Sequence, residues 1–115
     1  INNLDLHPYL EHPMYQEQVS VFHVVLYKYK KKIKNNAIMY LYGNRILLDD
    51  ICLDFDSIHS ITVLGKNKLN IYTENQVFQL KGIKSFNALK YVNIYFHYQN
   101  IKKGDEENYE QFLGL

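Results

Sequence analysis

The stretch AIMYLYGNRILLDD, residues 37–50, places two apolar segments on either side of the pair Gly43-Asn44. A two-residue connection of this kind supplies the positive φ that a tight turn between antiparallel strands needs. The stretch therefore predicts a β-hairpin. Segments with strand-like composition lie on both sides of this hairpin, so the whole chain is expected to be rich in β-strands.

Strand-like segments continue from Val19 to Gly82. VSVFHVVLYKY, residues 19–29, is dense in β-branched and aromatic side chains, and the segments after the hairpin are ICLDF, IHSITVLG, LNIYT and VFQLKG. After Gly82 the apolar residues recur at helical intervals, and Ser85 is the expected N-cap. The chain is therefore predicted to be mainly β: a curved antiparallel sheet or partial barrel of six to seven strands, capped by one C-terminal α-helix.

One compact domain is the expected organisation, because 115 residues suffice for a single hydrophobic core and not for two of ordinary size. We place the domain at residues 19–100. A lead-in segment, 1–18, holds both prolines, and an acidic C-terminal tail, 101–115, follows the domain. The chain begins with Ile1 rather than Met, which indicates a piece of a longer protein.

Composition and charge exclude several classes of protein. Thirteen basic and twelve acidic residues leave a net charge of +1, so the chain lacks the global positive field of a nucleic-acid-binding protein. Cys52 is the single cysteine, which excludes an internal disulfide and a thiolate-built zinc site and fits a reducing compartment. The sequence has neither a signal peptide nor an apolar run of membrane-spanning length, so the expected location is cytoplasmic.

The candidate site is a local lysine run within LYKYKKKIKNN, residues 26–36. Its members are Lys28, Lys30, Lys31, Lys32 and Lys34. They are called the hairpin lysines below, because they lie near the first hairpin of the chain. If the first strand continues through the run, alternation places all of them except Lys31 on the face of Phe22, Val24 and Leu26. Two interpretations stay open: a docking surface for an anionic membrane, or a solvated strand end whose lysines discourage edge-to-edge pairing. No RNA-binding motif surrounds the run, so no nucleic-acid partner is predicted.

The order of the segments carries a family resemblance over residues 19–100. The hairpin IMYLYGNRILLDD precedes an Asp-x-x-x-Ile segment from Asp54 to Ile58, and a Gly-Lys-Asn turn then leads through a second hairpin to a helix that begins SFNALKYV. This order resembles the pleckstrin-homology superfold in its bacterial, GRAM-like branch. The resemblance implies a curled sheet closed by a helix. It also implies that the hairpin lysines lie where phosphoinositide-binding members place their cationic pocket.

The C-terminal part, LKGIKSFNALKYVNIYFHYQNIKKGDEEN…FLGL, resembles the end of bacterial 1-acyl-glycerol-3-phosphate acyltransferases of the Firmicutes type, in which a small domain follows the catalytic one. That family's signature is a histidine followed four residues later by aspartate, with the histidine as general base. No histidine in this sequence has aspartate at that spacing. The resemblance implies a non-enzymatic accessory domain of a lipid-metabolising protein, which helps to position its parent at the inner face of the membrane.

A different class of function stays open: a protein-interaction or oligomerisation module that does not bind lipid and uses a sheet edge or a groove along the final helix. Tyr91, Tyr95 and Tyr98 fall close together on that helix and would line such a groove. The preferred interpretation of these tyrosines is a core boundary with rings inside and hydroxyls in water. The partner is then the rest of the parent protein or another protein, and the sequence does not determine the oligomeric state.

The remaining polar candidates are assigned to structure, and no metal or cofactor is predicted. Two sets contain metal-ligand types: Asp49, Asp50, Asp54 and Asp56, and near the N-terminus His7, Glu11 and His12. The first lacks the glycine and closing glutamate of a calcium loop, and the second lacks a third histidine and is expected in a surface loop. We expect Asp49 and Asp50 to end a strand and Asp56 to cap a turn, unless these carboxylates pair with the hairpin lysines. His23 and His59 are expected at the core edge with hydrogen bonds, and Cys52 as a small buried apolar residue.

Overall fold

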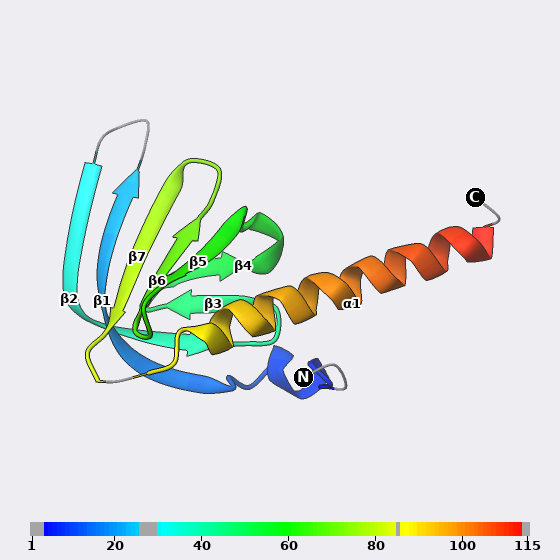
Figure 1. Cartoon of the computed structure of the whole chain (residues 1–115), viewed down its shortest axis with the longest axis horizontal. Coiled ribbons are helices and arrows are strands. Elements are labelled where there is room, and N and C mark those ends of the chain that lie inside the picture. Colours follow the sequence, from blue (N-terminus) through cyan, green and yellow to red (C-terminus); the bar gives the residue numbers. More distant parts are fainter. Residues whose placement is uncertain (1–3, 26–29, 85, 114–115) are drawn as a thin grey trace.

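The computed structural model describes residues 4–25, 30–84 and 86–113, apart from the side chains of 30–32 and 105–113. These residues form one seven-stranded antiparallel sheet followed by a single long helix (Figure 1). The elements are β1 (Tyr15–Val25), β2 (Lys30–Leu41), β3 (Arg45–Leu48), β4 (Ile51–Asp54), β5 (Ser60–Leu64), β6 (Lys68–Tyr72), β7 (Gln76–Gly82) and α1 (Leu89–Leu113). The strand order is β4-β3-β2-β1-β7-β6-β5, and the sheet curls into a half-barrel. The predicted mainly β fold, with six to seven strands and one C-terminal helix, is confirmed.

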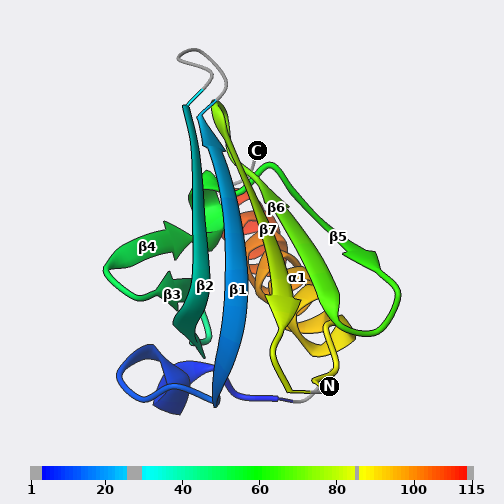
Figure 2. The same ribbon diagram turned by 90° about the vertical axis from the view of Figure 1, so that its left-hand side faces the viewer.

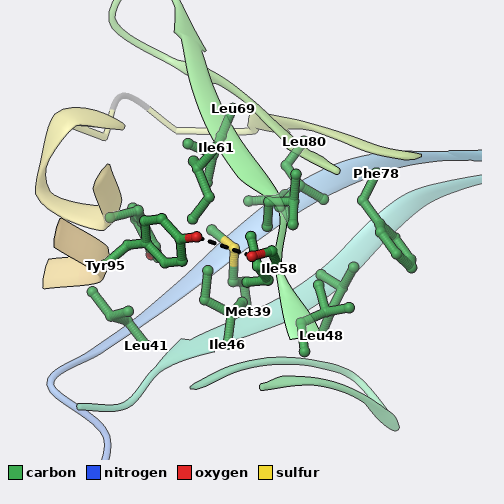
Figure 3. Close-up of a cluster of buried hydrophobic side chains, with 14 of the residues drawn as sticks. Met39, Leu41, Ile46, Leu48, Ile58, Ile61, Leu69, Phe78, Leu80 and Tyr95 are labelled. Atoms are coloured by element: carbon green, nitrogen blue, oxygen red, sulfur yellow. Dashed lines mark hydrogen bonds between the residues drawn. The ribbon is translucent and has the colours of Figure 1, made fainter. Parts of the chain in front are cut away.

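The core fills the concave side of the curled sheet (Figure 3). Alternate residues of each strand point inward. The apolar ones from β2, β3, β6 and β7 that are at most 2% exposed are Ala37, Met39, Leu41, Ile46, Leu48, Leu69, Ile71, Phe78 and Leu80. The long strand β1 bends around this core, since its register with β2 shifts between Val19 and Val21. From Val19 onward β1 pairs with β7 as well as with β2, and it thereby joins the two halves of the sheet.

The hairpin predicted around Gly43-Asn44 is present and joins β2 to β3. The positive φ expected at this turn is not found there. Among the described residues it occurs at Asp49 (φ 51°) and Gly65 (φ 66°). Glycine is needed at position 43 for another reason: a Cβ atom there would lie 3.0 Å from the carbonyl oxygen of Leu6. The small residue therefore lets the N-terminal segment pack closely against the turn.

Two boundaries in the first half of the chain differ from expectation. β1 begins at Tyr15, so the end of the lead-in segment 1–18 belongs to the sheet, where it pairs with β2. The second difference is that the lysine run does not continue the first strand. Residues 30–34 open β2 and run antiparallel to β1, while Leu26 and Lys28 lie outside the described residues. A chain reversal that sequence alternation does not reveal thus divides the long apolar and basic stretch into two strands.

Helix α1 closes one end of the half-barrel and then continues past the sheet (Figure 1). Asn87 caps it, since the Leu89 N–H donates to Asn87 Oδ1 at 3.0 Å. Ser85, the expected cap, lies outside the described residues. The tail expected over 101–115 is helical as far as Leu113. Glutamate, lysine and glutamine favour the helix there, and the interruption by Gly104 costs only about 1 kcal/mol.

Candidate anion-binding surface

The hairpin lysines of β2, within residues 30–34, begin that strand where it pairs with β1, at the end of the sheet away from the N-terminal segment (Figure 2). Three of them, Lys30, Lys31 and Lys32, pair through the backbone with Val25, Val24 and His23. Lys28 belongs to the connection between the two strands and lies outside the described residues. The fold therefore concentrates the run at the end of a strand pair instead of spreading it along one strand.

Lys34 is the hairpin lysine whose side chain is described, and it already has an ionic partner. Its Nζ contacts Asp49 Oδ2, while Asp49 Oδ1 accepts a hydrogen bond from the Ile38 N–H at 2.9 Å. The Ile38 N–H and then Lys34 hold the pKa of the Asp49 carboxyl below its ordinary value. Asp49 and Asp50 form the turn that ends β3, as expected, and pairing of the acidic set with the lysines is confirmed for Asp49. Lys34 therefore has less charge to offer to a phosphate.

The space beside this ion pair is too small for a headgroup. A cavity of about 70 Å³ adjoins it, lined by Val21, His23, Lys34, Ala37, Leu48, Asp49, Asp50 and Ile51. Pockets that enclose small ligands usually measure about 300 Å³ or more. An anion held by the hairpin lysines would therefore bind at the surface of the protein.

A second hollow lies between β4 and the β6–β7 turn, and carboxylates are among its lining groups. An open hollow of about 470 Å³ is lined there by Asp56, Glu74 and His59 among other residues. Asp56 does not cap a turn as expected: its carboxylate accepts a hydrogen bond from the Tyr98 hydroxyl at 3.0 Å and contacts Lys102 Nζ at 2.8 Å. Lys102 lowers the pKa of this carboxyl. No lysine or arginine of the described residues lines the hollow, so it offers little attraction to an anion.

Groups with metal-ligand chemistry stay apart in the described part of the chain, where no three of them come together. The N-terminal set is exposed, on a 3₁₀ helix and the loop after it: His7, Glu11 and His12. His23 lies at the core edge as expected, with Nε2 2.6 Å from Gln76 Oε1. His59 and Cys52 are exposed, so the expectations for both are wrong. Cys52 lies in β4 and His59 directly precedes β5, and these are the two edge strands of the sheet.

The tyrosines of α1 anchor the helix. Tyr91 is fully buried and its hydroxyl donates to Glu17 Oε2, and Tyr95 is 7% exposed and donates to the Ile58 carbonyl at 2.9 Å (Figure 3). Burial raises the pKa of Tyr91 far above its ordinary value. Tyr98 is partly buried against Asp56. The preferred interpretation as a core boundary is confirmed, although the hydroxyls of Tyr91 and Tyr95 bond to protein rather than to water.

A second group of lysines comes together that was missed in the sequence. Lys68 pairs directly with Lys81 across β6 and β7, and the Gly82 N–H donates to the Asn67 carbonyl at 3.0 Å, which joins the β5–β6 turn to the end of β7. The group, called the sheet-end lysines below, consists of Lys66, Lys68, Lys81 and Lys84, all exposed. A signal for it did exist: a hairpin centred on Glu74-Asn75 places residue 68 opposite residue 81.

No helix of the described part of the chain is long and apolar enough to cross a membrane. Comparison with known proteins finds no matching family model and no matching curated protein. Surface chemistry and charge therefore carry the functional argument.

Proposed function

We propose that this chain is a non-catalytic, pleckstrin-homology-like accessory domain of a larger bacterial lipid-metabolising protein, such as a phospholipid-synthesis acyltransferase. Its role is to help hold the parent protein at the anionic inner face of the cytoplasmic membrane. The curled sheet closed by a C-terminal helix supports the family resemblance, and the resemblance in turn supports the accessory role.

The observation that carries the proposal is the concentration of lysine at one end of the β1–β2 pair. Five lysines fall within residues 28–34 of a chain whose net charge is +1, and the register confines Lys30–Lys34 to the first residues of β2. Each basic residue near an anionic bilayer contributes about 1 kcal/mol. The ion pair with Asp49 reduces what Lys34 adds, so Lys28, Lys30, Lys31 and Lys32 would supply most of the attraction.

Vesicle co-sedimentation tests the proposal. The unaltered domain is expected to bind vesicles of phosphatidylglycerol and phosphatidylcholine at low salt, to release them as ionic strength rises, and to ignore phosphatidylcholine alone. Changing Lys28, Lys30, Lys31 and Lys32 to glutamine should weaken this binding, whereas Lys34→Gln alone should have a small effect. Salt-insensitive binding, or no binding to anionic vesicles, would refute membrane docking.

A protein-interaction module is the second candidate, and the exposed face of α1 favours it. Leu89 and Phe96 are 53% and 55% exposed, and their spacing of seven residues places them on the same side of the helix. Such an apolar surface would meet the rest of the parent protein or another protein. A contact of this kind would resist salt and would be weakened by Phe96→Ser, while the glutamine substitutions in β2 would leave it unchanged.

A further inference from the structure

The sheet-end lysines form a cationic surface without local compensation. Lys68 and Lys81 stand directly opposite each other in β6 and β7, an arrangement that is unfavourable for like charges. None of the four sheet-end lysines is in an ion pair with a residue of the described ranges. Glu17 lines a hollow together with Lys84, but its carboxylate contacts Lys90 and bonds to Tyr91. The fold thus holds like charges together at this place, which an anionic partner would stabilise.

Exposed aliphatic side chains accompany these charges. Leu64, which pairs with Lys68 across β5 and β6, is 48% exposed, and Ile83, between Lys81 and Lys84 in the chain, is 49% exposed. Their mixture with lysine suits the interface of a bilayer, where aliphatic groups enter the acyl boundary and ammonium groups meet lipid phosphates.

The patch continues along the convex face of the sheet toward Lys31, which pairs with Val24. Figure 2 looks onto this face, with α1 behind the sheet. Across it the register places Phe22 beside Ile33, which is 67% exposed, and Val24 beside Val77, which pairs in turn with Tyr72. These residues alternate with the core positions and therefore share the outer side with Lys68 and Lys81. An apolar middle thus lies between the sheet-end lysines and Lys31.

The sheet-end lysines and Lys31 are close enough to touch one flat surface. Ser20 of β1 pairs with Lys81, and Val24 pairs with Lys31. Lys30 and Lys32 pair with Val25 and His23, so alternation places these two on the concave side. The four residue steps from Ser20 to Val24 span about 13 Å at about 3.3 Å per residue. A planar bilayer could therefore meet the sheet-end lysines and Lys31 at once, with the apolar residues between them.

We propose that the convex face of β1, β5, β6 and β7 is a membrane-contact surface, and that the domain lies face-on against an anionic bilayer through the sheet-end lysines together with Lys31 of the hairpin lysines. The inference rests on the proposed function and adds an orientation to it. Helix α1 lies on the opposite side of the sheet and extends away from that face (Figures 1 and 2). Face-on binding therefore directs the far end of α1 away from the lipid.

Two variants of equal charge change separate the two ends. One replaces Lys66, Lys68, Lys81 and Lys84 by glutamine; the other replaces Lys28, Lys30, Lys31 and Lys32 by glutamine. Each lysine that meets the bilayer is expected to contribute roughly five-fold to binding of phosphatidylglycerol-containing vesicles at low salt, so the first variant should bind several-hundred-fold more weakly. The second variant should lose at least the roughly five-fold contribution of Lys31. Removal of the like-charge pair at Lys68 and Lys81 should leave the melting temperature unchanged or higher, which shows that the variant folds.

A fluorophore reports the orientation directly. In a Cys52→Ser background, an environment-sensitive label at Leu64→Cys should shift its emission to the blue when anionic vesicles are added, and a label at Asn100→Cys on the exposed side of α1 should not. Absence of any binding by the unaltered domain overturns both the proposed function and this inference. Binding that depends on the hairpin lysines alone, with the label at position 64 remaining in water, overturns the face-on orientation and leaves the proposed function standing.

Discussion

Removing one hydroxyl at a time from the tyrosines of α1 should measure how the helix is held. Tyr91 donates to the Glu17 carboxylate from a fully buried position, Tyr95 donates to the Ile58 carbonyl, and Tyr98 donates to an exposed carboxylate. A hydrogen bond to a charged group is worth about 2 kcal/mol and one to a neutral group about 1 kcal/mol. The contact of Tyr98 at the surface should contribute less than about 0.5 kcal/mol.

The expected loss of unfolding free energy is therefore largest for Tyr91→Phe, intermediate for Tyr95→Phe and smallest for Tyr98→Phe. Guanidinium unfolding followed by far-ultraviolet circular dichroism suits the comparison, because the chain has no tryptophan and tyrosine fluorescence would change with each substitution. In melting temperature the first two losses correspond to roughly 10 °C and 5 °C. Tyr40→Phe is the control, since Tyr40 is partly exposed in β2 and its hydroxyl has no hydrogen-bond partner among the described residues. A loss for Tyr98→Phe equal to that for Tyr91→Phe would refute the reasoning.

Two further predictions concern backbone and charge. Gly82→Ala would place a Cβ atom 1.9 Å from a ring carbon of Phe86, so it should cost about 2 kcal/mol or more, whereas Gly104→Ala in open space on α1 should stabilise by about 1 kcal/mol; paired thermal melts check both signs. Asp49→Asn tolerates the φ of 51° and retains an acceptor for the backbone but loses the charge next to Lys34. Because the folded-state pKa of Asp49 is lowered, its charge stabilises the fold above the unfolded value of about 3.9 and ceases to do so as pH falls through the folded value. The variant should therefore be less stable by under about 1 kcal/mol at pH 7 and equal to the parent protein near pH 2, and a constant difference across this range would contradict the assignment.

Local patterns predicted most of the fold, because apolar alternation and turn residues act over short stretches of chain. The hairpin at Gly43-Asn44, the meander after it and the closing helix all follow from such patterns. The reversal between Val25 and Lys30 was missed because its residues show no turn signal. The helix end was missed for a related reason: Gly104 and the acidic residues after it suggested a tail, although a glycine in an otherwise helix-favouring stretch carries only a small cost.

The candidate site was less accessible to sequence reasoning, since charge pairing depends on which strands become neighbours. The run Lys28 to Lys34 is conspicuous because its members are adjacent in the chain, yet the fold places Asp49 against Lys34. Lys68 and Lys81 are thirteen residues apart and become neighbours only through the register of β6 and β7. A surface assembled across strands is visible in the sequence only after each hairpin has been centred correctly.

The net charge of the chain is close to zero, but the fold distributes its acidic and basic side chains unevenly over the surface. Glu17 and Asp56 contact Lys90 and Lys102 of α1, and Asp49 contacts Lys34. Three carboxylates thus form ion pairs that stabilise α1 and the β2–β3 pair. The sheet-end lysines have no ionic partner in the described part of the chain. A net charge of +1 is therefore compatible with strong, local attraction to an anionic surface. Because attraction between exposed charges is screened within about 8 Å at physiological ionic strength, the arrangement of charge on one face governs such docking more than the total does.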